Sequence, residues 1–305
     1  MASPNTLIVI TGATASGKSD VAVEVAQSLG CEVISADSRQ IYHDIPIVSA
    51  APTVEEMGGV PHHFVGTLPL DAYYSAARYE ADVMALLPKL FEKSRYAVLC
   101  GGSMMYVDAV TDGIDDLPDI SPEVRGYVAR LLADHGPEGL LAQLEILDPD
   151  YAAAVDRANT KRVAHAVEIS LAAGRPYSQL RVGERKPRPF NIIKVTVDRP
   201  REELFDRINR RVGKMVEKGL VDEARRLYPL RHLNSLNTVG LKELFACFDG
   251  RMTLDEALAR IAKNTRVYAK KQLTWLARPG IRPAQALRAE GACAELLSIV
   301  RKVSG

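Results

Sequence analysis

The chain has 305 residues, of which 47% are hydrophobic and 25% charged, so it is long enough to bury a large core in one or two domains. No stretch reaches the roughly 20 apolar residues needed to cross a bilayer, and the N-terminus lacks a signal-peptide pattern, so we expect no membrane partner. The formal net charge is +1, and the four cysteines follow no metal or redox spacing, which favours reduced thiols in a cytoplasmic protein.

The first motif in the chain is a glycine-rich loop between a predicted strand and a predicted helix. An apolar run predicts a strand over residues 7–11, and an apolar pattern at helical period follows residue 20. Between them Gly12, Gly17, Lys18 and Ser19 match the spacing of a phosphate-binding P-loop. Such a loop holds phosphate with backbone amides, while the lysine reaches the outer phosphates and the hydroxyl binds Mg²⁺.

Three further strands are predicted, over residues 32–35, 96–100 and 192–197. The first strands alternate with helical patterns, which indicates an α/β core with a parallel sheet. The strand at 32–35 runs into Asp37, and ligands of open α/β sheets bind beyond the carboxyl ends of strands. Asp37 is therefore the best candidate for a general base, although aspartates also commonly cap turns and helices.

The strand at 96–100 ends in Gly101, Gly102 and Ser103, where many phosphate-loop ATPases place an aspartate that binds magnesium. The missing acid weakens an ATPase interpretation. Glycine amides and the Ser103 hydroxyl are expected to contact leaving phosphates, unless the pair only forms a tight turn. His62 and His63 have no spaced partners for a metal and are expected to fix a loop through hydrogen bonds.

Residues 120–189 contain only helical patterns, so they are predicted to form a helical insertion within a core made of residues 1–119 and 190–305. A Pro- and Arg-rich linker over 174–190 closes the insertion. A helix follows in the core with Arg207, Arg210 and Arg211, which are predicted to close over an anionic ligand or to form a solvated face.

A basic stretch without any acidic residue runs from residue 257 to residue 289. Its helical pattern places Lys263, Arg266 and Lys270 on one face, where they could neutralise RNA phosphates. A solvated helix face explains these charges almost as well. Residues at spacings of three and four mark the face expected to pack, namely Leu258, Ile261, Thr265, Tyr268, Gln272 and Trp275.

The order of these motifs resembles that of the bacterial tRNA dimethylallyltransferase family, also called tRNA isopentenyltransferases. The resemblance is carried by GATASGKS, ISADSRQIY, VPHHF, GGSMMY, NTKRVAHAVE and AKKQLTWL, and it runs from Leu7 to about Leu276. It implies a P-loop NTPase-like core, with a parallel sheet flanked by helices, and an all-helical insertion domain. The family transfers a dimethylallyl group from its diphosphate to N6 of the adenosine just 3′ of the anticodon.

The resemblance also assigns roles to residues of this chain. It gives the catalytic roles to Asp37, Ser103 and Arg211, and places Mg²⁺ at Ser19. The diphosphate-binding loop comprises Gly12, Thr14, Ala15, Ser16, Gly17, Lys18 and Ser19. With the basic helix included, the expected tRNA contacts are Asp37, Ser38, Arg39, Gln40, Ser103, Arg125, Asn159, Lys161, Arg162, Lys263, Arg266 and Lys270. The partners are then tRNA and dimethylallyl diphosphate, and the chain is expected to act as a monomer.

Three alternatives remain open on the sequence. An adenylate isopentenyltransferase of cytokinin synthesis shares the prenyl chemistry but accepts AMP or ATP instead of RNA. A small-molecule kinase with the same phosphate loop would transfer phosphate from ATP. A non-catalytic RNA-binding module would leave Asp37 and the phosphate loop without a task.

Overall fold

The computed structural model describes residues 5–278 and 285–304. The chain divides into two compact units, a core unit of residues 1–111 and 188–305 and a helical unit of residues 112–187. The helical unit therefore includes residues 112–119, which the sequence patterns assigned to the core. Among the described residues, no helix is long and apolar enough to cross a membrane.

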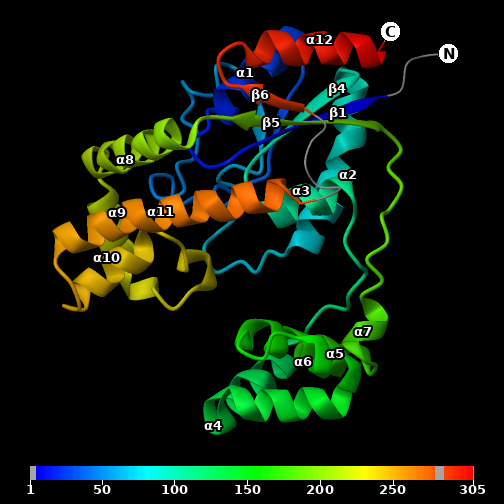
Figure 1. Ribbon diagram of the computed structural model, residues 1–305, viewed down its shortest axis with the longest axis vertical. Coiled ribbons are helices and arrows are strands. Elements are labelled where there is room, and N and C mark those ends of the chain that lie inside the picture. The colour runs from blue at the N-terminus through cyan, green and yellow to red at the C-terminus, as the bar shows by residue number, and fades with distance from the viewer. Residues whose placement is uncertain (1–4, 279–284, 305) are drawn as a thin grey trace. The chain divides into compact units, whose positions relative to one another are not determined.

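The core unit is built on a parallel sheet of six strands in the order β3-β2-β4-β1-β5-β6 (Figure 1). The strands are β1 (Thr6–Thr11), β2 (Val33–Ser35), β3 (His62–His63), β4 (Tyr96–Cys100), β5 (Asn191–Asp198) and β6 (Gln285–Arg288). The central strand β1 is buried along its whole length, as expected for a parallel sheet covered on both faces. The predicted α/β class is confirmed, while the short edge strands β3 and β6 were not predicted.

Helices cover both faces of this sheet. On one face α1 (Lys18–Leu29) and α12 (Ala292–Ser304) share an apolar cluster with β1, β4 and β5. Figure 1 shows α2 (Ala76–Lys93), α3 (Met104–Thr111) and α11 (Leu254–Leu276) on the other side. Because side chains alternate along β1, Ile8 and Ile10 face α1, and Leu7 and Val9 face the opposite helices. This layering leaves the carboxyl ends of the strands as the edge at which loops converge.

A second apolar cluster of the core unit fixes the loop that follows β2. Here α9 (Leu220–Leu227) and α10 (Leu241–Phe248) pack with α11, with α8 (Arg201–Glu217) and with residues 41–48 of the loop. The carboxylate of Glu223 in α9 accepts hydrogen bonds from the backbone N–H groups of Ile47, at 2.9 Å, and Val48, at 2.8 Å. Short 3₁₀ helices over Tyr228–Leu230 and Asn234–Leu236 complete this region. The loop after β2 is therefore held by a packed helical layer.

The helical unit has an apolar core of its own. It consists of α4 (Pro122–Leu147), α5 (Pro149–Ala154), α6 (Thr160–Ala173) and α7 (Tyr177–Leu180). A kink at Gly136, with φ of 67°, precedes Pro137 and separates α4 into the two helical patterns seen in the sequence. The short helix α7 lies within the segment expected to be a linker. Asp148 stabilises it by accepting hydrogen bonds from the backbone N–H and the hydroxyl of Ser178.

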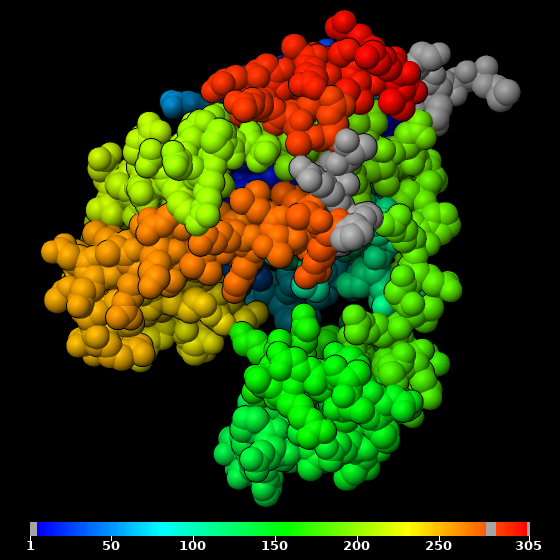
Figure 2. Space-filling view, in the orientation of Figure 1, coloured from blue at the N-terminus to red at the C-terminus, as the bar shows by residue number. Residues whose placement is uncertain are grey.

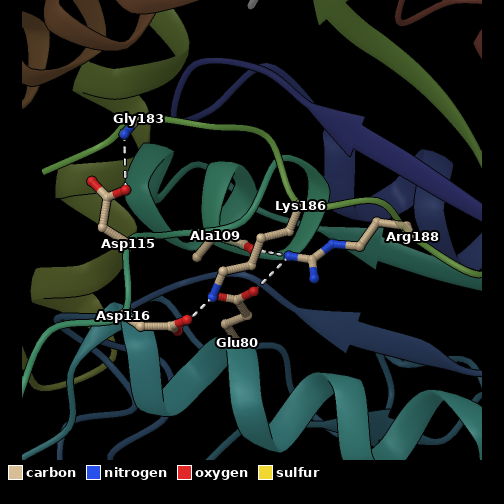
Figure 3. A network of polar contacts seen from close by, with 7 residues as sticks. All are labelled: Glu80, Ala109, Asp115, Asp116, Gly183, Lys186 and Arg188. Atoms are coloured by element: carbon tan, nitrogen blue, oxygen red, sulfur yellow. Dashed lines mark hydrogen bonds and ion pairs between the residues drawn. The ribbon is translucent and has the colours of Figure 1, made fainter. Parts of the chain in front are cut away.

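Polar contacts cross-link the outgoing and returning segments of the helical unit (Figure 3). Lys186 Nζ lies 2.6 Å from Asp116 Oδ1, and the Gly183 N–H donates to Asp115 Oδ1 at 2.8 Å. These bonds explain why residues 112–119, which form no helix, belong to this unit. Figure 3 also shows Arg188, the first residue of the returning core segment, bonded to Glu80 of α2.

Candidate active site

The phosphate loop joins β1 to α1 and depends on two glycines. Gly12 has φ of +154°, and a Cβ atom there would lie 2.6 Å from Ser16 Oγ and 2.7 Å from the Val197 carbonyl oxygen. Gly17 has φ of +97° at the start of α1. Since L-residues with side chains rarely adopt this conformation, the loop can close only with glycine at these positions.

Two arginines orient the backbone of the loop. Arg207 Nε donates to the Ala15 carbonyl at 2.9 Å, and Arg199 Nε donates to the Ser16 carbonyl at 2.7 Å. In a planar trans peptide the carbonyl points away from the N–H of the next residue. Holding the Ser16 carbonyl outward therefore turns the Gly17 N–H toward the other side of the loop, as an anion-binding nest requires.

Other groups of the loop fit an anionic ligand. The Ser16 hydroxyl is buried and has no hydrogen-bond partner among the described residues. This is costly unless a ligand accepts a hydrogen bond from it. The ammonium group of Lys18 lies 3.4 Å from the Ala13 carbonyl oxygen. Burial lowers the pKa of Lys18 and Arg211 lowers it further, although Cys100 and Asp37 act in the opposite direction. An anion in the loop would compensate this buried positive charge.

Asp37 follows β2 and has two functions in its loop. Its Oδ1 atom accepts hydrogen bonds from the backbone N–H groups of Arg39, at 2.9 Å, and Gln40, at 3.3 Å, so it forms the turn. Its Oδ2 atom accepts no hydrogen bond from the residues that the structure describes. Burial lowers the pKa values of Lys18 and Arg211, and the carboxylate of Asp37 opposes this effect in both cases. The turn role and a free carboxylate oxygen therefore coexist.

Ser103 joins the end of β4 to the Asp37 loop. It is buried, and its Oγ accepts the backbone N–H of Ser38 at 2.8 Å and lies 3.2 Å from the Ser38 hydroxyl. The preceding Gly101 packs so closely that a Cβ atom would lie 2.1 Å from the Ala36 carbonyl oxygen. Its N–H donates to the Ile10 carbonyl, so the expectation that this amide contacts phosphate is wrong. The glycine is needed because two strand ends approach each other here.

The three arginines predicted to close over an anion behave differently from one another. Arg211 Nη1 lies 3.2 Å from Thr14 Oγ1, and burial lowers the pKa of this guanidinium, an effect opposed by Asp37. Arg207 instead holds a loop carbonyl, and Arg210 is exposed. Arg199 was not predicted as a site residue, because its role follows only from the pairing of β5 with β1.

Arg39 and Gln40 are held by other parts of the core unit. The guanidinium of Arg39 donates to the carbonyl groups of Asn234, Ser235 and Asn237. The Gln40 side chain donates to the Ala50 carbonyl at 3.0 Å and accepts from the Ser35 hydroxyl at 3.1 Å. Both side chains thus order the loop after β2, and their contact with tRNA stays a prediction.

The remaining predicted tRNA contacts of the insertion lie in the helical unit. Asn159 caps α6, because its Oδ1 accepts the backbone N–H of Arg162 at 3.3 Å. Lys161 and Arg162 in the first turn are exposed, and Arg125 in the first turn of α4 is half-buried. The exposed pair gives α6 a cationic end available to a phosphate.

The basic face of α11 lies in the core unit, where Figure 2 shows this helix in orange along the viewed surface. Lys263 and Lys270 are exposed, whereas Arg266 donates to Asn209 of α8. The buried face of α11 includes Ile261, Gln272 and Trp275, as predicted. Tyr268 was expected to pack but is 38% exposed, and the neighbouring Ala269 is fully buried instead.

The histidine pair forms β3 at the edge of the sheet. His62 Nδ1 lies 2.8 Å from the Val60 carbonyl oxygen, and His63 Nε2 lies 2.6 Å from Glu32 Oε2. These bonds confirm that the histidines fix local structure. Over residues 5–278 and 285–304, no group of three or more His, Cys, Asp or Glu side chains could hold a metal ion.

Comparison with known proteins gives concordant matches. A family model described as IPP transferase matches residues 40–279. A tRNA dimethylallyltransferase 2 of Porphyromonas gingivalis is 54% identical over 274 residues, covering 90% of this chain and 91% of the relative. A tRNA dimethylallyltransferase of Christiangramia forsetii is 42% identical, with 89% and 90% of the two chains covered.

Solved structures are also similar. The crystal structure of a tRNA isopentenylpyrophosphate transferase from Bacillus halodurans has a TM-score of 0.69 and 33% identity, covering 98% of this chain and 96% of that one. A eukaryotic dimethylallyltransferase acting on tRNA has a TM-score of 0.82 and 25% identity, covering 97% of this chain and 78% of that one.

Proposed function

The chain belongs to the IPP transferase family, and on that premise we propose that it transfers a dimethylallyl group from dimethylallyl diphosphate to N6 of the adenosine 3′-adjacent to the anticodon of tRNA. It is a transferase, as its relatives are. One observation carries the assignment of the site: a phosphate loop with a buried Ser16 hydroxyl lies at the same sheet edge as Asp37, and neither that hydroxyl nor Asp37 Oδ2 has a hydrogen-bond partner among the residues that the structure describes.

The phosphate loop is suited to hold the diphosphate that leaves as product. Cleavage of the carbon–oxygen bond sends its electron pair to the diphosphate oxygen and leaves positive charge on the allyl group. Lys18, Arg211 and the loop amides would stabilise the departing negative charge with groups that are already oriented. Preorganised donors of this kind typically contribute about 3–4 kcal/mol each to the transition state.

Asp37 is suited to receive the proton of the acceptor. The exocyclic amine of adenine is a poor nucleophile, and a carboxylate with an ordinary pKa of about 4 cannot deprotonate it in advance. The Oδ2 atom of Asp37 would take the proton as the new C–N bond forms, while Oδ1 keeps the loop in place through the N–H groups of Arg39 and Gln40. The target base must leave its stack to reach this carboxylate.

Ser19 would hold a Mg²⁺ ion that the diphosphate shares. Its side chain is exposed in the first turn of α1, directly after Lys18. A single hydroxyl fits Mg²⁺, because this ion usually takes one or two protein oxygens and completes its shell with phosphate oxygens and water. The ion would supply further neutralisation of diphosphate charge.

The proposal assigns tRNA contacts to both units of the chain. Exposed lysines of α11, and Lys161 and Arg162 of α6, would meet phosphates of the anticodon arm. We infer that the chain acts as a monomer, as the resemblance implied. We place the reaction in the cytoplasm, in keeping with the absence of a metal or redox spacing among the four cysteines.

Asp37→Asn tests the assignment more sharply than an alanine variant does. The asparagine carbonyl can still accept the N–H groups of Arg39 and Gln40, so the turn is kept and the base is lost. We expect transfer to an anticodon stem-loop to fall by about 10²–10⁴-fold, with diphosphate and RNA affinities nearly unchanged. Asp44→Asn, at a half-exposed aspartate of the same loop, is the matched control and should keep full turnover. Full turnover in Asp37→Asn would defeat the assignment of the base.

A further inference from the structure

Gln272 of α11 is a buried polar residue that the proposed reaction leaves without a role. Its side chain is 3% exposed. Its Oε1 atom accepts the Thr14 N–H at 2.8 Å, and its Nε2 atom donates to the Gly102 carbonyl at 2.9 Å. A backbone N–H can only donate and a carbonyl can only accept, so the two partners fix the orientation of the amide.

A substitute side chain of the same length that lacks the amide would leave no room for a water molecule to replace it. The space around the amide is lined by residues such as Gly12, Met104 and Trp275 and is too narrow to admit water. A Cβ atom on Gly102 would lie 2.4 Å from Gln272 Nε2, so the glycine is needed for this approach. With such a substitute the Thr14 N–H and the Gly102 carbonyl, which belong to half-buried residues, would be left without this partner and without water, which costs more than an ordinary hydrogen bond contributes.

The two bonds of Gln272 end at opposite sides of the candidate site. Thr14 lies in the phosphate loop, and its hydroxyl is bonded to Arg211, which belongs to the side of the leaving diphosphate. Gly102 directly precedes Ser103, whose hydroxyl holds Ser38 beside Asp37, the side of the acceptor. The Gln272 side chain thus positions the backbone of Thr14, next to the groups that bind the diphosphate, and of Gly102, next to the groups that face the acceptor base.

We propose that Gln272 is a positioning residue for the transfer reaction, which holds the phosphate loop and the Ser103 turn in register from the RNA-facing helix α11. The inference rests on the proposed function, because it concerns the same site. Since Gln272 touches backbone and not the reacting atoms, it acts through Thr14 and Ser103. Its removal should therefore lower kcat more than it raises KM, because substrate binding has many other contacts while alignment has few.

Gln272→Met removes both hydrogen bonds and keeps the length of the side chain. We expect the dissociation constant of inorganic diphosphate, measured by calorimetry, to rise about 10-fold, and single-turnover transfer to fall by about 100-fold, because two half-buried backbone groups would lose their partner. Thr274→Met, at an exposed position on the same helix, introduces the same residue and should change neither quantity. Equal diphosphate affinity and equal transfer in the two variants would overturn the proposal.

Gln272→Glu provides a readout that a merely structural residue would not show. A protonated carboxyl group can donate to the Gly102 carbonyl and accept from Thr14, as the amide does, whereas a carboxylate would repel that carbonyl. The residues lining the space around the amide are not titratable. The nearest charged group along the hydrogen-bond network is the guanidinium of Arg211, which is bonded to the Thr14 hydroxyl. Burial would raise the pKa of the introduced carboxyl, so the variant is competent below that pKa and impaired above it.

The pH experiment compares Gln272→Glu with the wild-type chain at each pH, so that effects common to both cancel. We expect the ratio of transfer rates to rise as pH falls, and a ratio that stays constant would contradict the proposal. Diphosphate binding separates this inference from the proposed function. If the wild-type chain binds diphosphate but modifies no RNA, the proposed function fails, while the binding comparison of Gln272→Met with Thr274→Met still decides whether Gln272 positions the loop.

Discussion

Arg188→Met should destabilise the core unit more than any exposed arginine variant does. The side chains of Arg188 and Glu80 are 7% and 10% exposed, and Nη2 lies 2.7 Å from Glu80 Oε1. The same guanidinium donates to the Ala109 carbonyl at 2.6 Å and the Val110 carbonyl at 2.9 Å, in the last turn of α3. Removing one partner of a buried ion pair typically costs about 3–5 kcal/mol, because the other charge remains buried.

Urea unfolding followed by the fluorescence of Trp275 measures this loss, since Trp275 is the only tryptophan and lies in the core unit. Arg78→Met is the control: Arg78 pairs with Asp82 in α2 of the same unit, but its side chain is 69% exposed, so the change should cost less than about 1 kcal/mol. Adding Glu80→Met to Arg188→Met should recover stability, because the buried carboxylate of Glu80 is then removed together with its cation. A loss equal to that of Arg78→Met would refute the reasoning.

Three other predictions concern binding and turnover. Burial and Arg211 lower the pKa of Lys18. Diphosphate binding measured by calorimetry should therefore weaken as pH rises through that pKa, because the neutral amine no longer attracts the anion. Lys18→Met should abolish this pH dependence. Ser103→Ala should reduce transfer by about 10–100-fold by leaving the half-buried Ser38 N–H without its partner, and Ser103→Thr, which keeps the hydroxyl, should not. Lys263→Glu with Lys270→Glu should weaken RNA binding and reduce its salt slope by roughly 1.5–2, and an unchanged slope would make these lysines a solvated face.

The central strands could be predicted from the sequence because they are continuous apolar runs, as in β1 and β4. The edge strands could not, since β3 has two residues, both histidines, and β6 has four with alternating exposure. The helix α7 was missed because it is one turn long, and it is held by Asp148, which lies 30 residues earlier in the chain. Long-range contacts of this kind leave no local pattern.

The candidate site could likewise be predicted only in part. Spacing alone indicated the phosphate loop, and the position of Asp37 after β2 indicated its nearness to that loop. The supporting residues were not visible: Arg199 reaches Ser16 because β5 pairs with β1, and Gln272 reaches Thr14 from 258 residues away. Their side chains form hydrogen bonds to backbone groups, so no sequence motif of reactive residues identifies them. Gln272 did fall on the predicted buried face of α11, and a buried amide on such a face is the one available signal.

Transfer of label from dimethylallyl diphosphate in the presence of Mg²⁺ tests the central claim most directly. The acceptors are an anticodon stem-loop with adenosine 3′ of the anticodon, the same RNA with guanosine at that position, and AMP. Label in the adenosine RNA alone is the predicted result. Label in AMP would indicate an adenylate isopentenyltransferase, and no label in any acceptor, with a folded protein that binds diphosphate, would contradict the proposed reaction.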